Sequence, residues 1–250
     1  MKRKLTTVYK PASGPGFLGK GHTASPVIGV DFSQSDPFIM LMDDRLEKTD
    51  DIPVGGPHPH AGFETVSLLL QGEFGEGEHG MKAGDFEIMT AGSGIVHTET
   101  ISHPTNMRLL QLWLNLPREE RHAKPRVQHL SAEHVPGVSK DGASIKVYSG
   151  SFAGATSPVR NHTPLIVAEI RLEPGASMTG VLPSDFSAFL YVLDGVAQVD
   201  GNSKTLKLDE VGWLDRGDHP GDSDLTLTAG DRGAHLVVYA AQPHHHEIVS

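Results

Sequence analysis

Short apolar runs, broken by Gly, Pro and charged residues, recur along the whole chain. Their lengths and their β-forming residues are typical of strands. The predicted strands lie at 27–32, 36–42, 63–70, 85–90, 95–100, 107–116, 165–173, 186–193, 208–215, 225–229 and 235–241. Apolar residues show no long 3.6-residue period, so we expect only a few short helices, one of them at Arg118–His122. The pattern therefore predicts an all-β protein.

Two pairs of candidate metal ligands flank the strands predicted at 63–70 and 85–90. His58 and His60 are one residue apart, and so are His97 and Glu99. Residues i and i+2 of a strand point to the same face, so each pair can aim at one point. If the two strands are neighbours, four ligands converge on one metal, and imidazole with carboxylate suits Fe, Zn, Cu, Ni or Mn. For either pair alone, chance histidines on an exposed strand are the alternative.

The strand pattern of the first half restarts in the second. The run 63–70 is closed by Gln71-Gly72, and the run 186–193 is closed by Asp194-Gly195. This repeat predicts an internal duplication, with an N-terminal metal-binding barrel at 1–125 and a C-terminal barrel at 126–250. Aligning Gly72 with Gly195 places Val181 and Pro183 where His58 and His60 lie, so the second barrel is expected to lack the metal ligands.

Composition limits the classes of function. The chain of 250 residues has 21 Lys and Arg against 31 Asp and Glu, a formal net charge of −10, which disfavours direct binding of nucleic acid. Cysteine is absent, which excludes disulfides and thiolate chemistry. The N-terminus has no apolar signal segment, and no run is long enough to span a membrane. We therefore expect a cytoplasmic protein with no membrane partner.

The stretches PHPHAGFETVSLLLQG and KAGDFEIMTAGSGIVHTE resemble the signature of the pirins, members of the cupin superfamily. DPFIMLMDD, QLWLNLP and SKDGASIKVYSG also resemble pirin segments. The resemblance implies two jelly-roll barrels of the cupin type with one divalent metal in the N-terminal barrel. It assigns the ligands to His58, His60, His97 and Glu99. Fe(II) is the metal expected first, with Zn, Ni, Mn, Cu and Co as alternatives.

Some pirins oxidise flavonols as quercetinases, and others are regulators that use iron as a redox sensor. The function expected here is a metal-dependent dioxygenase that opens a small aromatic substrate, a flavonol such as quercetin, with O2. The alternatives are a non-enzymatic, iron-binding regulator with a protein partner, and another cupin activity, such as an isomerase, on a smaller ligand. Two departures from the family pattern are the short turn at Gly72–Gly80, which suggests an open mouth, and Ala61 in place of a basic residue.

Glu99 is the expected catalytic base, because a carboxylate on the metal can shift between ligand and base. Glu64 is the second candidate, as a base or a fifth ligand, although an ordinary strand-end carboxylate, solvated or hydrogen-bonded to the backbone, is the favoured explanation. Phe63, Met89 and Ile95 either shape a dry pocket or belong to the core. Trp113 and Trp213 are expected in the core or at a domain interface. The remaining histidines have no ligand spacing and are expected at the surface or in hydrogen bonds; they include His103, His122, His129, His134, His162, His219 and His235.

Overall fold

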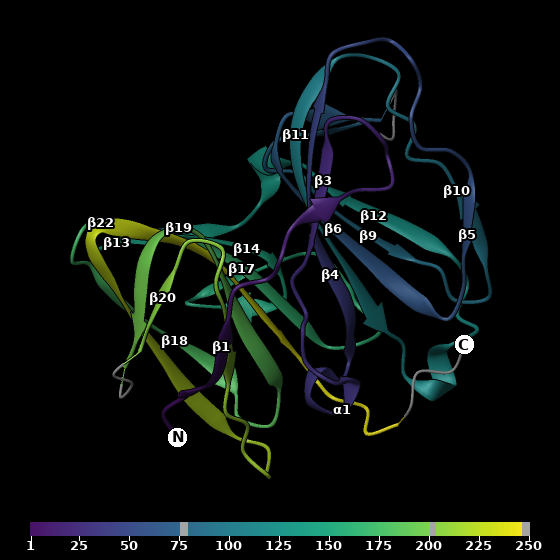
Figure 1. The fold of residues 1–250 in the computed structure, drawn as a ribbon. Helices are drawn as coiled ribbons and strands as arrows, with labels where there is room; N and C mark the ends of the chain where they lie inside the picture. The colour runs from purple at the N-terminus through teal and green to yellow at the C-terminus, as the bar shows by residue number, and fades with distance from the viewer. Residues whose placement is uncertain (76–79, 201–203, 247–250) are drawn as a thin grey trace. The chain divides into compact units, whose positions relative to one another are not determined.

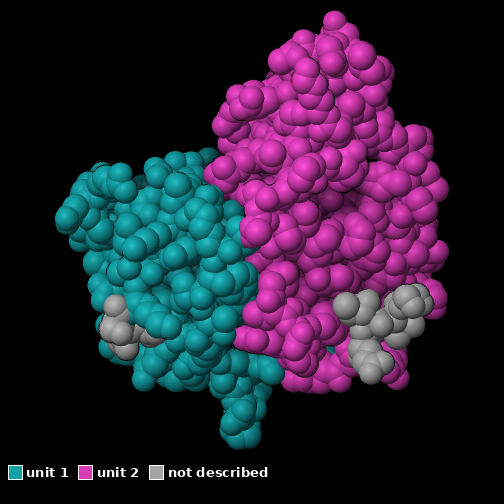
Figure 2. Space-filling view, viewed as in Figure 1, with its two compact units in different colours: residues 1–11, 135–244 teal, residues 12–134, 245–250 magenta. Residues whose placement is uncertain are grey.

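The computed structural model describes residues 1–75, 80–200 and 204–246, and it confirms the all-β prediction. Figure 1 shows the strands, and Figure 2 colours the two compact units into which the chain divides. The N-terminal unit comprises residues 12–134 and the chain end from residue 245, and the C-terminal unit comprises residues 1–11 and 135–244. Within the described residues, no helix has the length and apolar character needed to cross a membrane.

The N-terminal unit is built on a seven-stranded antiparallel sheet with two short ribbons beside it. The sheet order is β12 (Arg126–Leu130), β9 (Phe86–Thr90), β6 (Phe63–Gln71), β11 (Thr105–Asn115), β4 (Phe38–Lys48), β3 (His22–Pro26) and β2 (Gly14–Pro15). The ribbons are β5 (His58–His60) with β10 (Ile95–His97), and β7 (Glu73–Phe74) with β8 (Met81–Lys82). The predicted turn at Gly72–Gly80 contains residues 76–79, which lie outside the described residues.

The pleat of this sheet separates two kinds of side chain. Val66, Ile88 and Leu112 are register neighbours on β6, β9 and β11, and all three are buried. Gln111 and Trp113 point to the opposite face, because successive residues of a strand alternate between faces. That face is turned toward the β5–β10 ribbon, since Gln111 and Trp113 contact residues of the candidate site.

The C-terminal unit repeats this architecture in a nine-stranded sheet. The main order is β1 (Leu5–Tyr9), β21 (Val211–Leu214), β19 (Ser187–Val199), β22 (Asp222–Ala241), β17 (Leu165–Leu172), β14 (Ala143–Ser149) and β13 (Gly137–Lys140). Strand β18 (Ser177–Pro183) pairs with β22, β20 (Thr205–Lys207) pairs with β19, and β15 (Ser151–Phe152) forms a hairpin with β16 (Ala155–Thr156). The strands β9, β6, β11 and β4 thus correspond in order to β21, β19, β22 and β17, as a duplication requires.

The edge strands divide the chain differently from the predicted boundary between residues 125 and 126. Strand β12 pairs with β9 and so belongs to the N-terminal sheet, although it lies beyond residue 125. Strand β1 pairs with β21, so the first residues of the chain complete the C-terminal sheet. An unpaired strand edge needs a partner, and a strand distant in sequence can supply it. A prediction that divides the chain at a single point cannot detect that β1 joins the C-terminal sheet and β12 the N-terminal sheet.

Three local predictions need correction. The segment 27–31 is not a strand, and Phe32–Ser35 forms α1 instead. The strand expected at 95–100 ends at His97, so Glu99 lies in the loop that follows it. The strands expected at 225–229 and 235–241 are parts of one continuous strand, β22. The prediction of few helices is confirmed, since the others in the described chain are short 3-10 turns at Arg118–Glu120 and Ala132–His134.

Strand β18 contains Val181 and Pro183, which the sequence aligned with His58 and His60. On β18 the buried positions are Met178, Gly180 and Leu182, while Val181 is 47% exposed. Val181 therefore lies on the opposite face of β18 from these buried residues, and its alignment with His58 stays a prediction. Gly180 has no room for a side chain, because an added Cβ would lie 2.2 Å from the Phe152 ring. The absence of metal ligands from the C-terminal unit remains a prediction.

Candidate metal centre

The β5–β10 ribbon brings the histidines of the two ligand pairs together (Figure 1). The strands are antiparallel neighbours, with His97 directly opposite His58 and Ile95 opposite His60. His58 and His60 share a face because they are two residues apart on one strand. One ring nitrogen from each of the three histidines lies within 4.8 Å of the others. The condition set from the sequence, that these two strands are neighbours, is therefore met, and the three histidines can form a metal site.

The orientation of the rings favours metal binding. Nδ1 of His58 lies 2.8 Å from the carbonyl oxygen of Gly56, to which it can only donate a proton. This hydrogen bond selects the tautomer with the proton on Nδ1 and leaves the Nε2 lone pair available as a ligand. Nε2 of His58 faces Nε2 of His97 at 2.9 Å. The two rings thus direct the same atom toward the same point.

Glu99 approaches this cluster from the loop after β10. Its Oε2 lies 4.0 Å from Nε2 of His58, and its Oε1 accepts a hydrogen bond of 2.8 Å from Nε2 of Gln111. Because the strand ends at His97, the orientation of Glu99 is set by Gln111 on β11 and not by the pleat. The sequence analysis missed Gln111. Its signal was an amide in the middle of MRLLQLWLNL, the most apolar strand predicted in the first half.

The protonation states of the site suit a cation. Burial, together with the neighbouring His58 and His60, lowers the pKa of His97 to about 4. Burial also lowers the pKa of His60, with a contribution from His58. Burial raises the pKa of Glu99, although His58 and Gln111 oppose that rise. Neutral imidazoles are the form that binds metal, and a cation among them would stabilise the charged form of Glu99. The three nitrogen donors therefore fit a divalent transition metal, and the Glu99 carboxylate lies 4.0 Å from one of them.

The aromatic rings of Trp113 and Phe63 pack against the His60 ring. The Trp113 ring stacks on Phe63 with centroids 4.6 Å apart, and the His60 ring meets Trp113 edge-on at 5.4 Å. His60 also contacts the Phe63 ring at 5.2 Å. Both aromatic residues therefore position a candidate ligand, a role that the sequence analysis did not anticipate for either of them.

A cavity of about 810 Å³ opens beside His97 and Glu99. Met89 and Ile95, the two other residues expected in a pocket or in the core, line it. Its further apolar lining comes from Phe74, Met81, Val96 and Val127, and its polar lining from Glu87, Thr98, Thr100 and Ser102. The volume lies within the range of pockets that bind drug-sized ligands. A smaller cavity of about 50 Å³ reaches His58, Glu99 and Gln111, and it is also lined by the hydrogen-bonded pair His22–Asp44.

Glu64 lies away from this chemistry. It is fully buried and accepts a hydrogen bond of 2.7 Å from the Thr90 hydroxyl, which lies opposite it on β9. The neighbouring pair Thr65 and Met89 points to the other face of the sheet, where Met89 lines the larger cavity. Glu64 lines neither of these two cavities, so the structure does not place it as a base or a fifth ligand.

Comparison with known proteins identifies the family. The family model of pirin matches residues 23–114, and that of the pirin C-terminal cupin domain matches residues 167–250. Pirin from Homo sapiens is 32% identical over 214 residues, which cover 83% of this chain and 72% of that protein. A pirin-like protein from Solanum lycopersicum is 37% identical over 176 residues, which cover 68% of this chain but only 59% of that protein.

Two solved structures share the fold over almost the whole chain. GK1651 from Geobacillus kaustophilus has a TM-score of 0.88 at 28% identity and covers 99% of both chains. A quercetin 2,3-dioxygenase from Acinetobacter baumannii has a TM-score of 0.78 at 25% identity, covering 98% of this chain and 81% of that one. With its two cupin domains and a histidine cluster in the first, this chain belongs to the pirin family.

Proposed function

We propose that this protein is a metal-dependent dioxygenase that opens flavonols such as quercetin with O2. His58, His60, His97 and Glu99 would hold one divalent metal, with Fe(II) expected first. The observation that carries the proposal is the convergence of three imidazoles next to a cavity with apolar walls and a few polar groups. Such a cavity suits a flat aromatic molecule with hydroxyl groups. The similarity to a quercetin 2,3-dioxygenase supports the same assignment.

Each residue of the site has a distinct task in this reaction. Bound there, a divalent metal supplies Lewis acidity, which lowers the pKa of a hydroxyl group coordinated to it. The Gly56 carbonyl keeps His58 in the tautomer that binds through Nε2. Gln111 holds one oxygen of Glu99 and leaves the other directed toward the histidines. Met89 and Ile95 line the cavity and would exclude water from the face of an aromatic ring bound there. These residues would thus hold the metal and orient the substrate beside it.

An oxygen-consumption assay tests this function. Protein loaded with Fe(II), Ni, Mn, Cu, Co or Zn is mixed with quercetin in an oxygen electrode, and the products are analysed. We expect at least one metal to give consumption of equal amounts of quercetin and O2, with release of carbon monoxide. Chelator-treated protein is the control and should be inactive. Intact quercetin with every metal, at full metal occupancy, would contradict the proposal.

A regulatory iron protein that binds a protein partner is the second candidate. Val96 is 68% exposed, and it lies on β10 next to His97. The His58 side chain is 39% exposed, so a partner at this surface could sense the state of the metal. In that case metal-loaded protein would leave quercetin intact, and binding of a partner would change with the oxidation state of the metal.

The pH dependence of metal binding follows from the lowered pKa values of His60 and His97. An exposed histidine becomes charged near pH 6.5, but these two remain neutral at lower pH because burial disfavours their charged form. We therefore expect bound metal to persist as the pH falls to about 6 and to be lost mainly between about 6 and 4. Protonation of Glu99, whose pKa is raised by burial, adds to the loss in this window.

The measurement is elemental analysis of protein dialysed at each pH against a fixed concentration of metal. The metal-free protein should also become less stable over the same range. The unfolded chain binds protons below about pH 6.5, whereas the folded chain binds them at His97 only near pH 4. Complete loss of metal above pH 6 would show that exposed groups hold it, and not the buried histidines.

A further inference from the structure

Glu87 is a second carboxylate in the cavity beside the metal centre. It lies on β9, where Phe86 and Ile88 are fully buried on the opposite face of the strand. Ser67 on β6 and His129 on β12 lie directly opposite it in the register. Glu87 lines the cavity of about 810 Å³ together with His97 and Glu99. A ligand that reaches the metal from this cavity therefore passes a carboxylate that is not one of the four proposed ligands.

The surroundings of Glu87 can accommodate a proton that it receives. Nδ1 of His129 lies 3.8 Å from its Oε2, and Nε2 of the same ring lies 3.5 Å from Oδ2 of Asp85. Asp85 is fixed by hydrogen bonds of 2.8 Å from the backbone N–H groups of Lys82 and Ala132. The His129 side chain is 33% exposed. A proton on Glu87 thus has a solvent-exposed imidazole beside it through which it can leave.

We propose that Glu87 binds a hydroxyl group of the substrate and takes its proton. This inference rests on the proposed function, because it assumes a hydroxylated aromatic substrate bound next to His97 and Glu99. In the step, the O–H bond of the substrate breaks and its electron pair stays on the substrate oxygen. The proton forms a new O–H bond with the Glu87 carboxylate. No oxidant or reductant takes part.

Glu99 and Glu87 have different surroundings, and this difference supports the assignment. Glu99 has one oxygen held by Gln111 and the other directed toward the histidines, so a metal would occupy it. Glu87 is not one of the proposed metal ligands, and it lines the cavity. Burial raises its pKa, His129 opposes that rise and Glu99 adds to it. A carboxylate with a raised pKa is the more effective base near neutral pH.

The test is anaerobic binding of quercetin to metal-loaded protein, followed by the absorbance of the deprotonated flavonol between pH 6 and 9. The variant Glu87→Gln keeps the shape of the side chain but cannot accept a proton. We expect it to bind the metal normally and to bind quercetin about 10- to 100-fold more weakly at pH 7, the loss expected for one hydrogen bond to a charged group. The loss should shrink at high pH, where the flavonol is already deprotonated.

The matched control is Glu47→Gln, an exposed carboxylate on β4 that lines neither cavity. It should bind quercetin as the unaltered protein does. Equal affinity and an equal pH profile for both variants would overturn the role of Glu87, and so would loss of metal from Glu87→Gln. Admitting air then separates the two hypotheses. If the unaltered protein binds quercetin but consumes no O2, the dioxygenase function fails, while the comparison of affinities still tests Glu87. If it binds no quercetin, both fail.

Discussion

Replacing His60 by alanine is expected to lower metal affinity by more than about 100-fold and to abolish flavonol turnover. The ring is 8% exposed and is held by Trp113 and Phe63, so its position in the site is strongly constrained. Loss of an outer partner of a ligand already costs 10- to 100-fold in affinity, and loss of the ligand itself should cost more. The measurement is metal content per chain after loading and gel filtration, together with oxygen consumption.

The fold should survive this change. The β-sheet core of the unit is built from residues such as Leu68, Phe86 and Leu110, which the substitution does not touch. The control is His122→Ala, an exposed histidine of the same unit, which should leave metal content unchanged. Stoichiometric metal in His60→Ala would contradict the site assignment. Unfolded protein in that variant would show that the metal or the ring supports the fold, and His58→Ala, where the ring is more exposed, would then be the informative variant.

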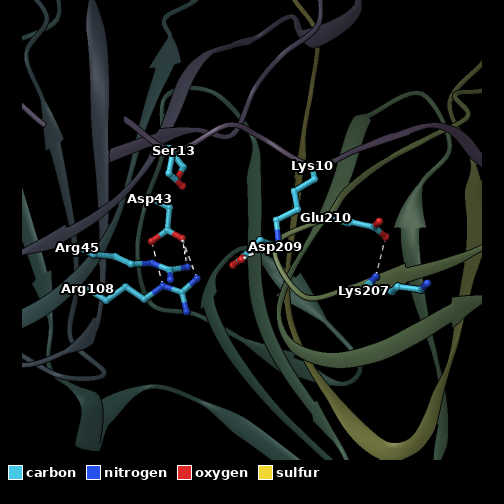
Figure 3. Close-up of polar contacts among 9 residues, drawn as sticks. Lys10, Ser13, Asp43, Arg45, Arg108, Lys207, Asp209 and Glu210 are labelled. Carbon is cyan, nitrogen blue, oxygen red and sulfur yellow. Dashed lines mark hydrogen bonds and ion pairs between the residues drawn. The ribbon is translucent and has the colours of Figure 1, made fainter. Parts of the chain in front are cut away.

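The substitution Asp43→Asn should destabilise the N-terminal unit by about 2–3 kcal/mol. Arg45 and Arg108 lie directly opposite each other on β4 and β11, and like charges in that position repel. The buried Asp43 carboxylate accepts Nε and Nη2 of Arg108 at 3.0 and 2.8 Å, and Nη2 of Arg45 at 3.0 Å (Figure 3). Removing one partner of a buried pair costs about 3–5 kcal/mol, and the partial exposure of both arginines reduces that figure.

The control for this prediction is a surface pair, Lys10 with Asp209, also shown in Figure 3. Lys10 is 57% exposed and its Nζ lies 3.3 Å from Oδ2 of Asp209, so Asp209→Asn should cost less than about 1 kcal/mol. Asp209 has a positive φ of 61°, which asparagine also adopts readily. Urea denaturation of each variant gives the change in the free energy of unfolding. Equal effects of the two substitutions on the free energy of unfolding would show that Asp43 does not offset the repulsion between Arg45 and Arg108.

The spacing of residues along the sequence was sufficient to single out the three histidines as candidate metal ligands. A strand alternates its side chains with a period of two, so His58 and His60 had to share a face wherever the strand packed. The all-β class and the repeat of the strand order could also be predicted, because apolar runs and turn residues are local signals. The resemblance to pirins rested mainly on the stretches around the histidines, which lie within the match of the pirin family model at residues 23–114.

The sequence by itself therefore determined the fold class and the three imidazoles that converge in the N-terminal unit. Only the tertiary structure decided the rest. Gln111 reaches Glu99, Glu87 enters the cavity, Glu64 faces away, and Trp113 supports His60 because of the register between strands far apart in the chain. A shift of one residue reverses the face on which every side chain of a strand lies. Register and the exchange of edge strands depend on packing between distant segments, and no local pattern specifies them.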